Sequence, residues 1–206
     1  MKKMREELLL RYPCLGDVID SIDKAAQTLV DTYKRGGTVL VCGNGGSCAD
    51  SDHIVGELMK GFLSLRPIES EQREAFANEL DENILSKLQR GIPAISLPAQ
   101  SAVISAYAND VDAELVYAQL VFGYGKKQDL FIGLSTSGNS KNVVAAARVA
   151  KAMGMSTLAL TGAKDSRLSE ICDVTIKAPE TETFKVQELH LPIYHYLCAF
   201  VEKTLF

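Results

Sequence analysis

The stretch TVLVCGNGGS, residues 38–47, contains the pattern that decides the fold. Its first half, residues 38–42, is almost entirely apolar, which is typical of a parallel strand buried on both faces. Its second half is rich in glycine, which lets the backbone turn tightly and approach a ligand closely. The stretch therefore predicts a buried strand that ends at a ligand-binding turn.

Strand-like and helix-like segments alternate on both sides of this stretch. Before it, apolar residues recur at helical spacing over residues 15–33, and Gly36-Gly37 ends that helix. The alternation predicts an α/β fold with three layers (α/β/α), a five-stranded, mainly parallel sheet, and flanking N- and C-terminal helices. Further strands are expected at 93–97, 129–134, 156–160 and 174–178, and further helices at 47–62, 102–108, 113–124, 140–153 and 184–205.

Length and composition limit the class of protein. At 206 residues, the chain is expected to form a single domain over residues 1–206, with N-terminal helices over residues 1–36. The formal net charge of −4 argues against direct nucleic-acid binding, and no apolar stretch reaches the roughly 18 residues that a membrane span needs. The first residues lack a signal-peptide pattern, and the five cysteines are scattered without a CxxC pair. We therefore expect a cytoplasmic protein with reduced thiols.

The segment 66–90 departs from the alternation because it is dense in charge. Its apolar residues Phe76, Leu80, Ile84 and Leu88 are spaced four apart, which predicts one face of a helix. The simpler interpretation is a charged helical insertion that packs on the surface of the domain. The alternative interpretation is an interface element or a lid.

Two segments carry the chemistry of a phosphate site, residues 43–47 and residues 135–140. Both follow predicted strands, and ligands of parallel α/β sheets bind outside the carboxyl ends of the strands. Hydroxyl groups at a helix N-terminus suit a phosphate monoester, and the sequence Ser-Thr-Ser-Gly-Asn-Ser over 135–140 offers more hydroxyls than helix capping needs. Nucleotide binding is disfavoured because Cys48 stands where a dinucleotide fingerprint has Gly or Ala, and no Walker lysine follows. A tight turn alone and plain capping remain the structural alternatives.

Six short motifs occur in order along most of the chain, and as a set they identify a family. They are GNGGS at 43–47, Asp52-His53-x-x-x-Glu57-Leu58, Ala108-Asn109-Asp110, GLSTSGNS at 133–140, Leu160-Thr-Gly162, and VQExH at 186–190. The set resembles the sugar isomerase (SIS) domain family, and within it the phosphoheptose isomerase group. The resemblance implies a flavodoxin-like SIS fold and an aldose–ketose isomerase that converts sedoheptulose 7-phosphate to D-glycero-D-manno-heptose 7-phosphate. It also implies a homotetramer with active sites between subunits, and we expect subunit contacts through the helix near residues 14–35 and the C-terminal helix.

The resemblance also implies roles for individual residues. Glu57 resembles the catalytic base and His195 the acid, and His53, Glu57, Gln187 and His195 match positions that hold zinc in some members. Residue spacing is compatible with this, since His53 and Glu57 are four apart and share a helix face. A lone helical histidine is as often only hydrogen-bonded. The residues expected to bind the sugar phosphate are Asn44, Gly45, Ser47, Asn109, Asp110, Ser135, Thr136, Ser137, Ser140 and Gln187.

Three departures from the family pattern set this chain apart, and one of them is the insertion 66–90, which lengthens a connection near the expected site. Lys60 stands near a position where many phosphoheptose isomerases have an arginine, and Pro192 lies inside the closing helix, where it removes one backbone donor. His190 faces away from His195 on a helical wheel, so we expect it to be structural. The alternative function is a non-catalytic SIS phosphosugar-binding regulator or scaffold, similar to the DnaA initiator-associating protein. Such a protein has no reason to keep both Glu57 and His195.

Overall fold

The computed structural model describes residues 2–206 and has a five-stranded sheet at its centre. The strands are ordered β2-β1-β3-β4-β5, and every neighbouring pair is parallel. The expected α/β fold with a mainly parallel sheet is therefore confirmed. The strands are β1 (Val39–Cys42), β2 (Ala94–Ser96), β3 (Leu130–Leu134), β4 (Ser156–Thr161) and β5 (Val174–Lys177).

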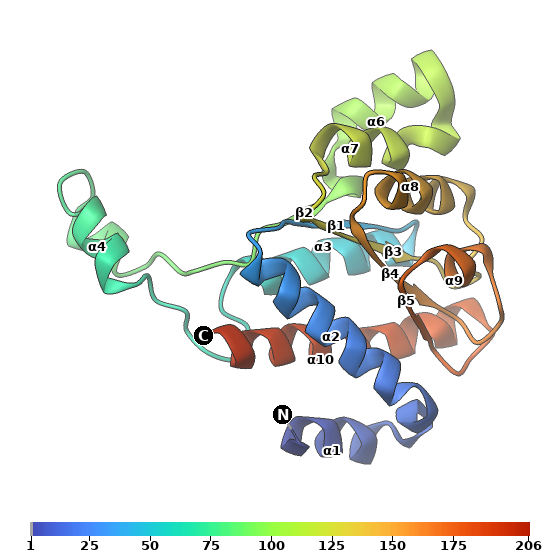
Figure 1. Cartoon of the computed structure of the whole chain (residues 1–206), viewed down its shortest axis with the longest axis horizontal. Coiled ribbons are helices and arrows are strands. Elements are labelled where there is room, and N and C mark those ends of the chain that lie inside the picture. The colour runs from blue at the N-terminus through green and yellow to red at the C-terminus, as the bar shows by residue number, and fades with distance from the viewer. Residues whose placement is uncertain (1) are drawn as a thin grey trace.

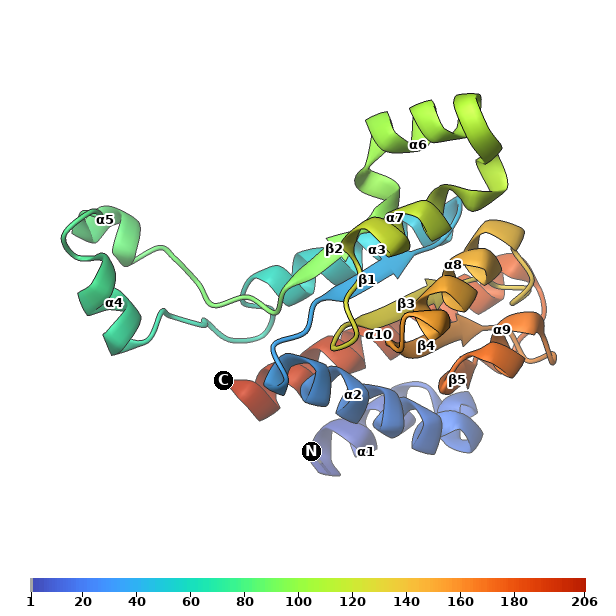
Figure 2. The same ribbon diagram turned by 45° about the horizontal axis from the view of Figure 1, so that its top comes forward.

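Helices cover both faces of the sheet and make the three layers (Figures 1 and 2). Side chains alternate along β1, so that Val39 and Val41 join one buried cluster whereas Leu40 and Cys42 join the other. The first cluster contains residues of α2 (Ile19–Lys34), α3 (Gly46–Met59) and α10 (Thr183–Leu205). The second contains residues of α7 (Val116–Tyr124), α8 (Lys141–Ala152) and α9 (Arg167–Ile171). The other helical segments near the body are α1 (Lys2–Arg11), α6 (Ser101–Tyr107), the π-helical segment Ala108–Asp112, and the 3-10 turns Pro13–Val18, Leu97–Ala99 and Ala113–Leu115.

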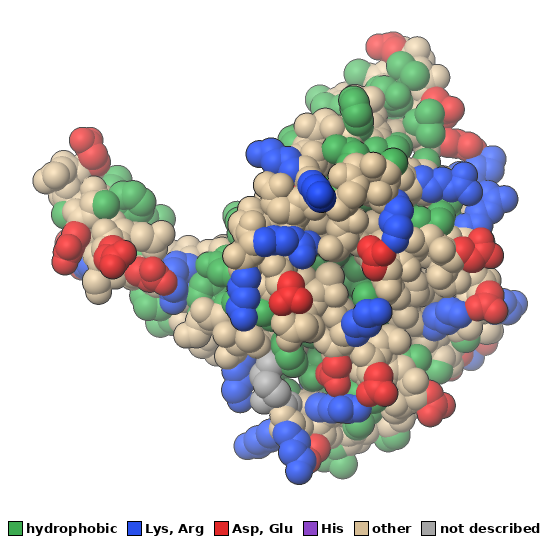
Figure 3. All heavy atoms as spheres, viewed as in Figure 1, with side chains coloured by type: hydrophobic (Ala, Val, Ile, Leu, Met, Phe, Trp, Pro, Cys, Tyr) green, Lys and Arg blue, Asp and Glu red, His purple; other side chains and the backbone are tan. Residues whose placement is uncertain are grey.

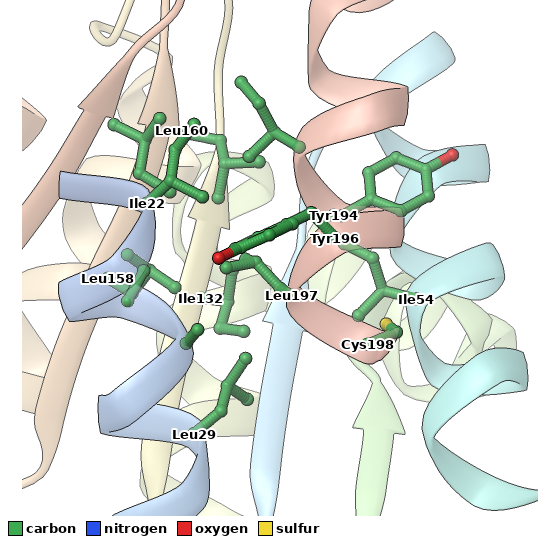
Figure 4. Packing of buried hydrophobic residues seen from close by; sticks show 14 of the residues in the cluster. Ile22, Leu29, Ile54, Ile132, Leu158, Leu160, Tyr194, Tyr196, Leu197 and Cys198 are labelled. Atoms are coloured by element: carbon green, nitrogen blue, oxygen red, sulfur yellow. The ribbon is translucent and has the colours of Figure 1, made fainter. Parts of the chain in front are cut away.

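The apolar face of α2 packs against other elements of the same chain. Ile22 and Leu29 lie against β3, β4 and α10, and Figure 4 shows them facing Ile132, Leu158 and Leu197. Ile22 is fully buried and Leu29 is 2% exposed. The apolar residues of α2 therefore cover this sheet, and they give no support to the expectation that they join subunits.

The charged segment 66–90 forms an arm that projects from the body (Figures 1 and 2). It contains two short helices, α4 (Ser70–Phe76) and α5 (Glu82–Leu85), which are separated by a turn. The prediction of one continuous helical face packed on the domain is therefore wrong. The break arises at Asp81, whose side chain accepts a hydrogen bond from the backbone N–H of Ile84 and starts a new helix there. Figure 3 shows acidic side chains gathered on this arm.

The root of the arm is fixed to the end of α10. Arg66 is fully buried and donates from Nε to Glu202 Oε1 over 2.7 Å. The guanidinium groups of Arg66 and Arg90 lie 5.0 and 4.7 Å from the ring centre of Phe206.

Within residues 2–206, no helix combines the length and the apolar character that a membrane span requires.

Candidate active site

The predicted hydroxyl loop lies between β3 and α8 and keeps its hydroxyls close together. Ser135 Oγ lies 2.9 Å from Ser140 Oγ and 3.5 Å from Ser137 Oγ. Gly138 turns the loop with a φ of 65°, a conformation that glycine adopts at little cost. Ser140 occupies the N-cap position of α8, yet among the described residues its hydroxyl accepts no capping hydrogen bond. Ser137 Oγ and Ser135 Oγ accept hydrogen bonds from the backbone N–H groups of Asn139 and Ser140, so the hydroxyls are gathered at a helix N-terminus, which is an arrangement suited to an anion.

The glycine-rich loop after β1 lies beside the hydroxyl loop. The side-chain amides of Asn44 and Asn142 pair reciprocally, with two hydrogen bonds of 2.9 Å that join the β1 loop to the start of α8. Gly45 has a φ of 56°, and the buried Ser47 lies in the first turn of α3. The two predicted phosphate segments are therefore brought together. Asn142 was missed, because nothing in its sequence position indicates a partner 98 residues away.

Gln187 lies at the glycine loop, at a distance from the other expected zinc ligands. A Cβ atom on Gly46 would lie 2.7 Å from Gln187 Nε2, so the absence of a side chain at Gly46 makes room for this amide. Gln187 precedes His195 by eight residues on α10, which corresponds to about 12 Å of helix rise. It is accordingly positioned to contact a ligand at the loop.

The expected acid–base residues meet where α3 crosses α10. His53 Nε2 lies 3.2 Å from Glu57 Oε1 and 3.4 Å from His195 Nε2. The other oxygen of Glu57 lies 3.3 Å from Lys60 Nζ, so Lys60 is placed at this cluster as well. The pKa of His195 is lowered, chiefly by burial and then by the neighbouring His53. An imidazole of lowered pKa is largely neutral near pH 7 and can exchange a proton with a substrate oxygen.

Two further residues extend this cluster and were not found from the sequence. The Tyr194 hydroxyl donates to Asp50 Oδ1 over 3.1 Å and lies 3.0 Å from His53 Nδ1. Burial raises the pKa of both Asp50 and Tyr194. The only sequence signals were the spacing of Asp50 three residues before His53 and the position of Tyr194 next to His195.

A pocket of about 380 Å³ opens beside His195. It is lined by Leu8 and Tyr12 from the N-terminal segment, by Phe62, and by Leu191 and His195 of α10. The ring of Phe62 lies 5.5 Å from that of His195. The pocket leaves the His195 imidazole partly accessible, which a proton-transfer group requires.

Other predicted residues are placed away from these groups. Asn109 and Asp110 are exposed residues of the π-helical segment Ala108–Asp112. Asn109 donates to Asp110 over 2.8 Å, and within residues 2–206 neither bonds to a different expected site residue. His190 is fully buried, 3.3 Å from the carbonyl oxygen of Thr161, and its pKa is lowered to about 4 by burial. It is structural, as expected. Pro192 lies inside α10, which continues through it.

The side chains of this cluster are of types that bind zinc, but they are not already arranged as a metal site. Two imidazoles and a carboxylate are common zinc ligands, and separations of 3.2 and 3.4 Å are near the roughly 3.3 Å between neighbouring ligands of a tetrahedral ion. Nevertheless, residues 2–206 contain no group of three or more His, Cys, Asp and Glu side chains arranged to hold a metal ion. The residue types and these two separations suit zinc, but the side chains as a group are not arranged around one metal position.

A parallel sheet with hydroxyls at its carboxyl edge and imidazoles nearby suits a protein of the sugar-phosphate-binding class, and comparison with known proteins identifies the family. The model of the SIS domain family matches residues 16–91 and 83–162. The chain therefore belongs to the SIS domain family.

Within that family, relatives over most of the chain are phosphoheptose isomerases. "Phosphoheptose isomerase 2" of Campylobacter jejuni is 36% identical over 203 residues, which cover 98% of this chain and 90% of the relative. The phosphoheptose isomerase of Aneurinibacillus thermoaerophilus is 33% identical over 190 residues, covering 92% and 84%. A solved phosphoheptose isomerase from Francisella tularensis is similar with a TM-score of 0.78 and 27% identity, covering 94% of this chain and 91% of that chain. The chain thus belongs to the phosphoheptose isomerase group.

Proposed function

We propose that the chain is a phosphosugar aldose–ketose isomerase that converts sedoheptulose 7-phosphate to D-glycero-D-manno-heptose 7-phosphate. The observation that carries the proposal is that Glu57 and His195 both approach His53, and that His53 and Glu57 lie on α3, which starts at the glycine-rich loop after β1. The names of the relatives support the choice of substrate.

The reaction moves a carbonyl group between C2 and C1 of the sugar. In this proposal the Glu57 carboxylate removes a proton from C1 and returns it to C2. His195 donates a proton to the C2 oxygen and accepts one from the C1 oxygen, so that the intermediate is an ene-diol. Each of these general acid–base groups contributes about 10²–10⁴-fold to the rate.

The phosphate group is held at the other end of α3 in this proposal. Ser47 lies in the first turn of α3, and His53 and Glu57 follow it by six and ten residues, or about 9 and 15 Å along the axis. A long sugar with its phosphate at the far end suits this separation better than a short one. The hydroxyls of Ser135, Ser137 and Ser140 supply hydrogen bonds to the phosphate oxygens.

Zinc, a homotetramer and a cytoplasmic location complete the proposal. A bound zinc ion would polarise the sugar carbonyl, and His53, Glu57 and His195 are the residues that would hold it, with Gln187 as an amide ligand only after rearrangement. A homotetramer is supported by exposed apolar residues outside α2, including Leu65, just before the arm, at 80% and Phe122 at 67% exposure. A non-catalytic regulator would explain the hydroxyl loop but gives no reason for Glu57 and His195 to meet.

The direct test is a substrate panel. The purified protein is incubated with ketose phosphates of seven, six and five carbons, with and without added zinc, and aldose formation is measured. We expect the seven-carbon substrate to be turned over most efficiently. Binding of phosphosugars without turnover under any metal condition would instead favour the regulator.

A further inference from the structure

A run of hydrogen bonds connects the proposed acid–base pair to two residues behind it. Asp50 lies one turn before His53 on α3, and Tyr194 directly precedes His195 on α10. The Tyr194 hydroxyl oxygen is 3.1 Å from Asp50 Oδ1 and 3.0 Å from His53 Nδ1. The opposite ring nitrogen of His53 faces Glu57 and His195.

The direction of these hydrogen bonds follows from the chemistry of the groups. A carboxylate has only acceptor atoms, so Asp50 takes the single hydrogen of the Tyr194 hydroxyl. The hydroxyl oxygen can then only accept from His53, which places a hydrogen on Nδ1. A neutral imidazole carries one N–H, so Nε2 of His53 is left with a lone pair.

We propose that Asp50 and Tyr194 are positioning residues that fix His53 as the Nδ1–H tautomer, with its Nε2 lone pair held between Glu57 and His195. This inference rests on the proposed function for its consequence. That lone pair can accept a hydrogen bond from Nε2–H of His195 and so orient the acid, or it can bind a cation. Without the hydrogen bonds that join Asp50, Tyr194 and His53, Nε2 of His53 would carry the hydrogen and donate it to Glu57, which would weaken Glu57 as a base.

The packing of Tyr194 suits this role, and its neighbour provides a matched control. The Tyr194 residue is only 1% exposed, so its hydroxyl is held in one place. Tyr196 lies two residues later on α10, and its hydroxyl donates to Asp23 over 2.7 Å. Figure 4 shows the two hydroxyls pointing to opposite sides of α10, and only that of Tyr194 bonds to the cluster.

The primary test is the tautomer itself, observed by nitrogen-15 NMR of the imidazoles in the full-length protein above pH 8. The chain has three histidines, so His53→Gln identifies the His53 signals. We expect a protonated Nδ1 and an unprotonated Nε2 for His53. Tyr194→Phe should reverse this pattern. Asp50→Ala should reverse it as well, because the freed hydroxyl hydrogen can turn toward Nδ1. Tyr196→Phe should leave the pattern unchanged.

Kinetics and metal binding provide the second readout. Tyr194→Phe should lower kcat for sedoheptulose 7-phosphate, or zinc affinity, by about 10- to 100-fold with little change in KM, as is typical when a group that orients a histidine is removed. Tyr196→Phe should stay within about twofold of the parent, a margin below the smallest effect of losing such a group.

An Nε2–H tautomer of His53 in the parent protein would overturn the inference, as would an unchanged spectrum in both Tyr194→Phe and Asp50→Ala. The spectrum does not depend on turnover. A parent with the expected tautomer and no isomerase activity would therefore contradict the proposed function alone.

Discussion

Arg66 and Glu202 form a buried ion pair that fixes the start of the projecting arm to the end of α10. Their side chains are 0% and 3% exposed, and Glu202 also accepts hydrogen bonds from the backbone N–H groups of Phe62 and Leu63. These hydrogen bonds and Arg66 outweigh burial and hold the pKa of Glu202 below its usual value. The pair thereby places Phe62 and Leu63 at the rim of the pocket that contains His195.

Loss of the Glu202 charge should destabilise the fold strongly. Glu202→Gln leaves the Arg66 guanidinium buried without a counter-charge, and breaking a buried pair in this way costs about 3–5 kcal/mol. Urea unfolding at pH 7.5 measures the change. Glu82→Gln is the control, because it removes an exposed pair with Arg73 and should change stability by less than about 1 kcal/mol. Equal effects of the two substitutions would contradict the structural role given to Glu202.

Loss of a hydroxyl from the loop after β3 should weaken phosphate binding. Ser140→Ala removes one proposed hydrogen bond to a charged group, which corresponds to about a 10-fold to 100-fold higher dissociation constant for the sugar phosphate. Isothermal titration calorimetry with sedoheptulose 7-phosphate measures this dissociation constant. Ser86→Ala, on the exposed arm, is the control and should bind like the parent. An unchanged affinity for Ser140→Ala would place the phosphate elsewhere.

Acidification should destabilise the protein through His190. Its pKa is about 4 in the folded chain against 6.5 in an unfolded one. Above pH 6.5 both states are neutral at this residue, so it makes no contribution to the pH dependence. As the pH falls from 6.5 to about 4, the unfolded state binds a proton that the folded state excludes, and stability decreases by up to about 3 kcal/mol.

Urea unfolding of the parent and of His190→Gln at pH 7.5 and pH 4.5 isolates this effect. The variant should lose less stability between the two pH values than the parent does. Equal losses would show that His190 is not the group responsible.

The sheet and its covering helices were predictable because their signals are local. Residues 38–42 are apolar on both faces of the strand, and the alternation of such strands with helical segments is enough to define a parallel sheet. The arm was not predictable in the same way. The spacing of Phe76, Leu80, Ile84 and Leu88 fits one helix, yet Asp81 caps a second, separate helix, and Leu85 is the apolar residue that becomes buried.

The same distinction applies to the site. His53 and Glu57 lie on one helix, so their proximity follows from a spacing of four residues. The meeting of His53 with His195, 142 residues later, depends on how α10 packs on α3, and the sequence indicated it only through family resemblance. Asp50 and Tyr194 are close to His53 and His195 in the sequence, but that position alone indicates no role, because their hydrogen bonds form only once the two helices are packed together.

Glu57 acts as the base of the proposed isomerase, and the substitution Glu57→Gln removes only this capacity. The substitution keeps the size and polarity of the side chain, but a neutral amide cannot remove a proton from carbon. Aldose formation from sedoheptulose 7-phosphate is measured alongside binding of the same sugar, with Glu71→Gln on the arm as the control. We predict that Glu57→Gln loses at least about 100-fold in turnover while its affinity for the sugar phosphate stays close to that of the parent. Turnover by Glu57→Gln at near the parent rate would contradict the account.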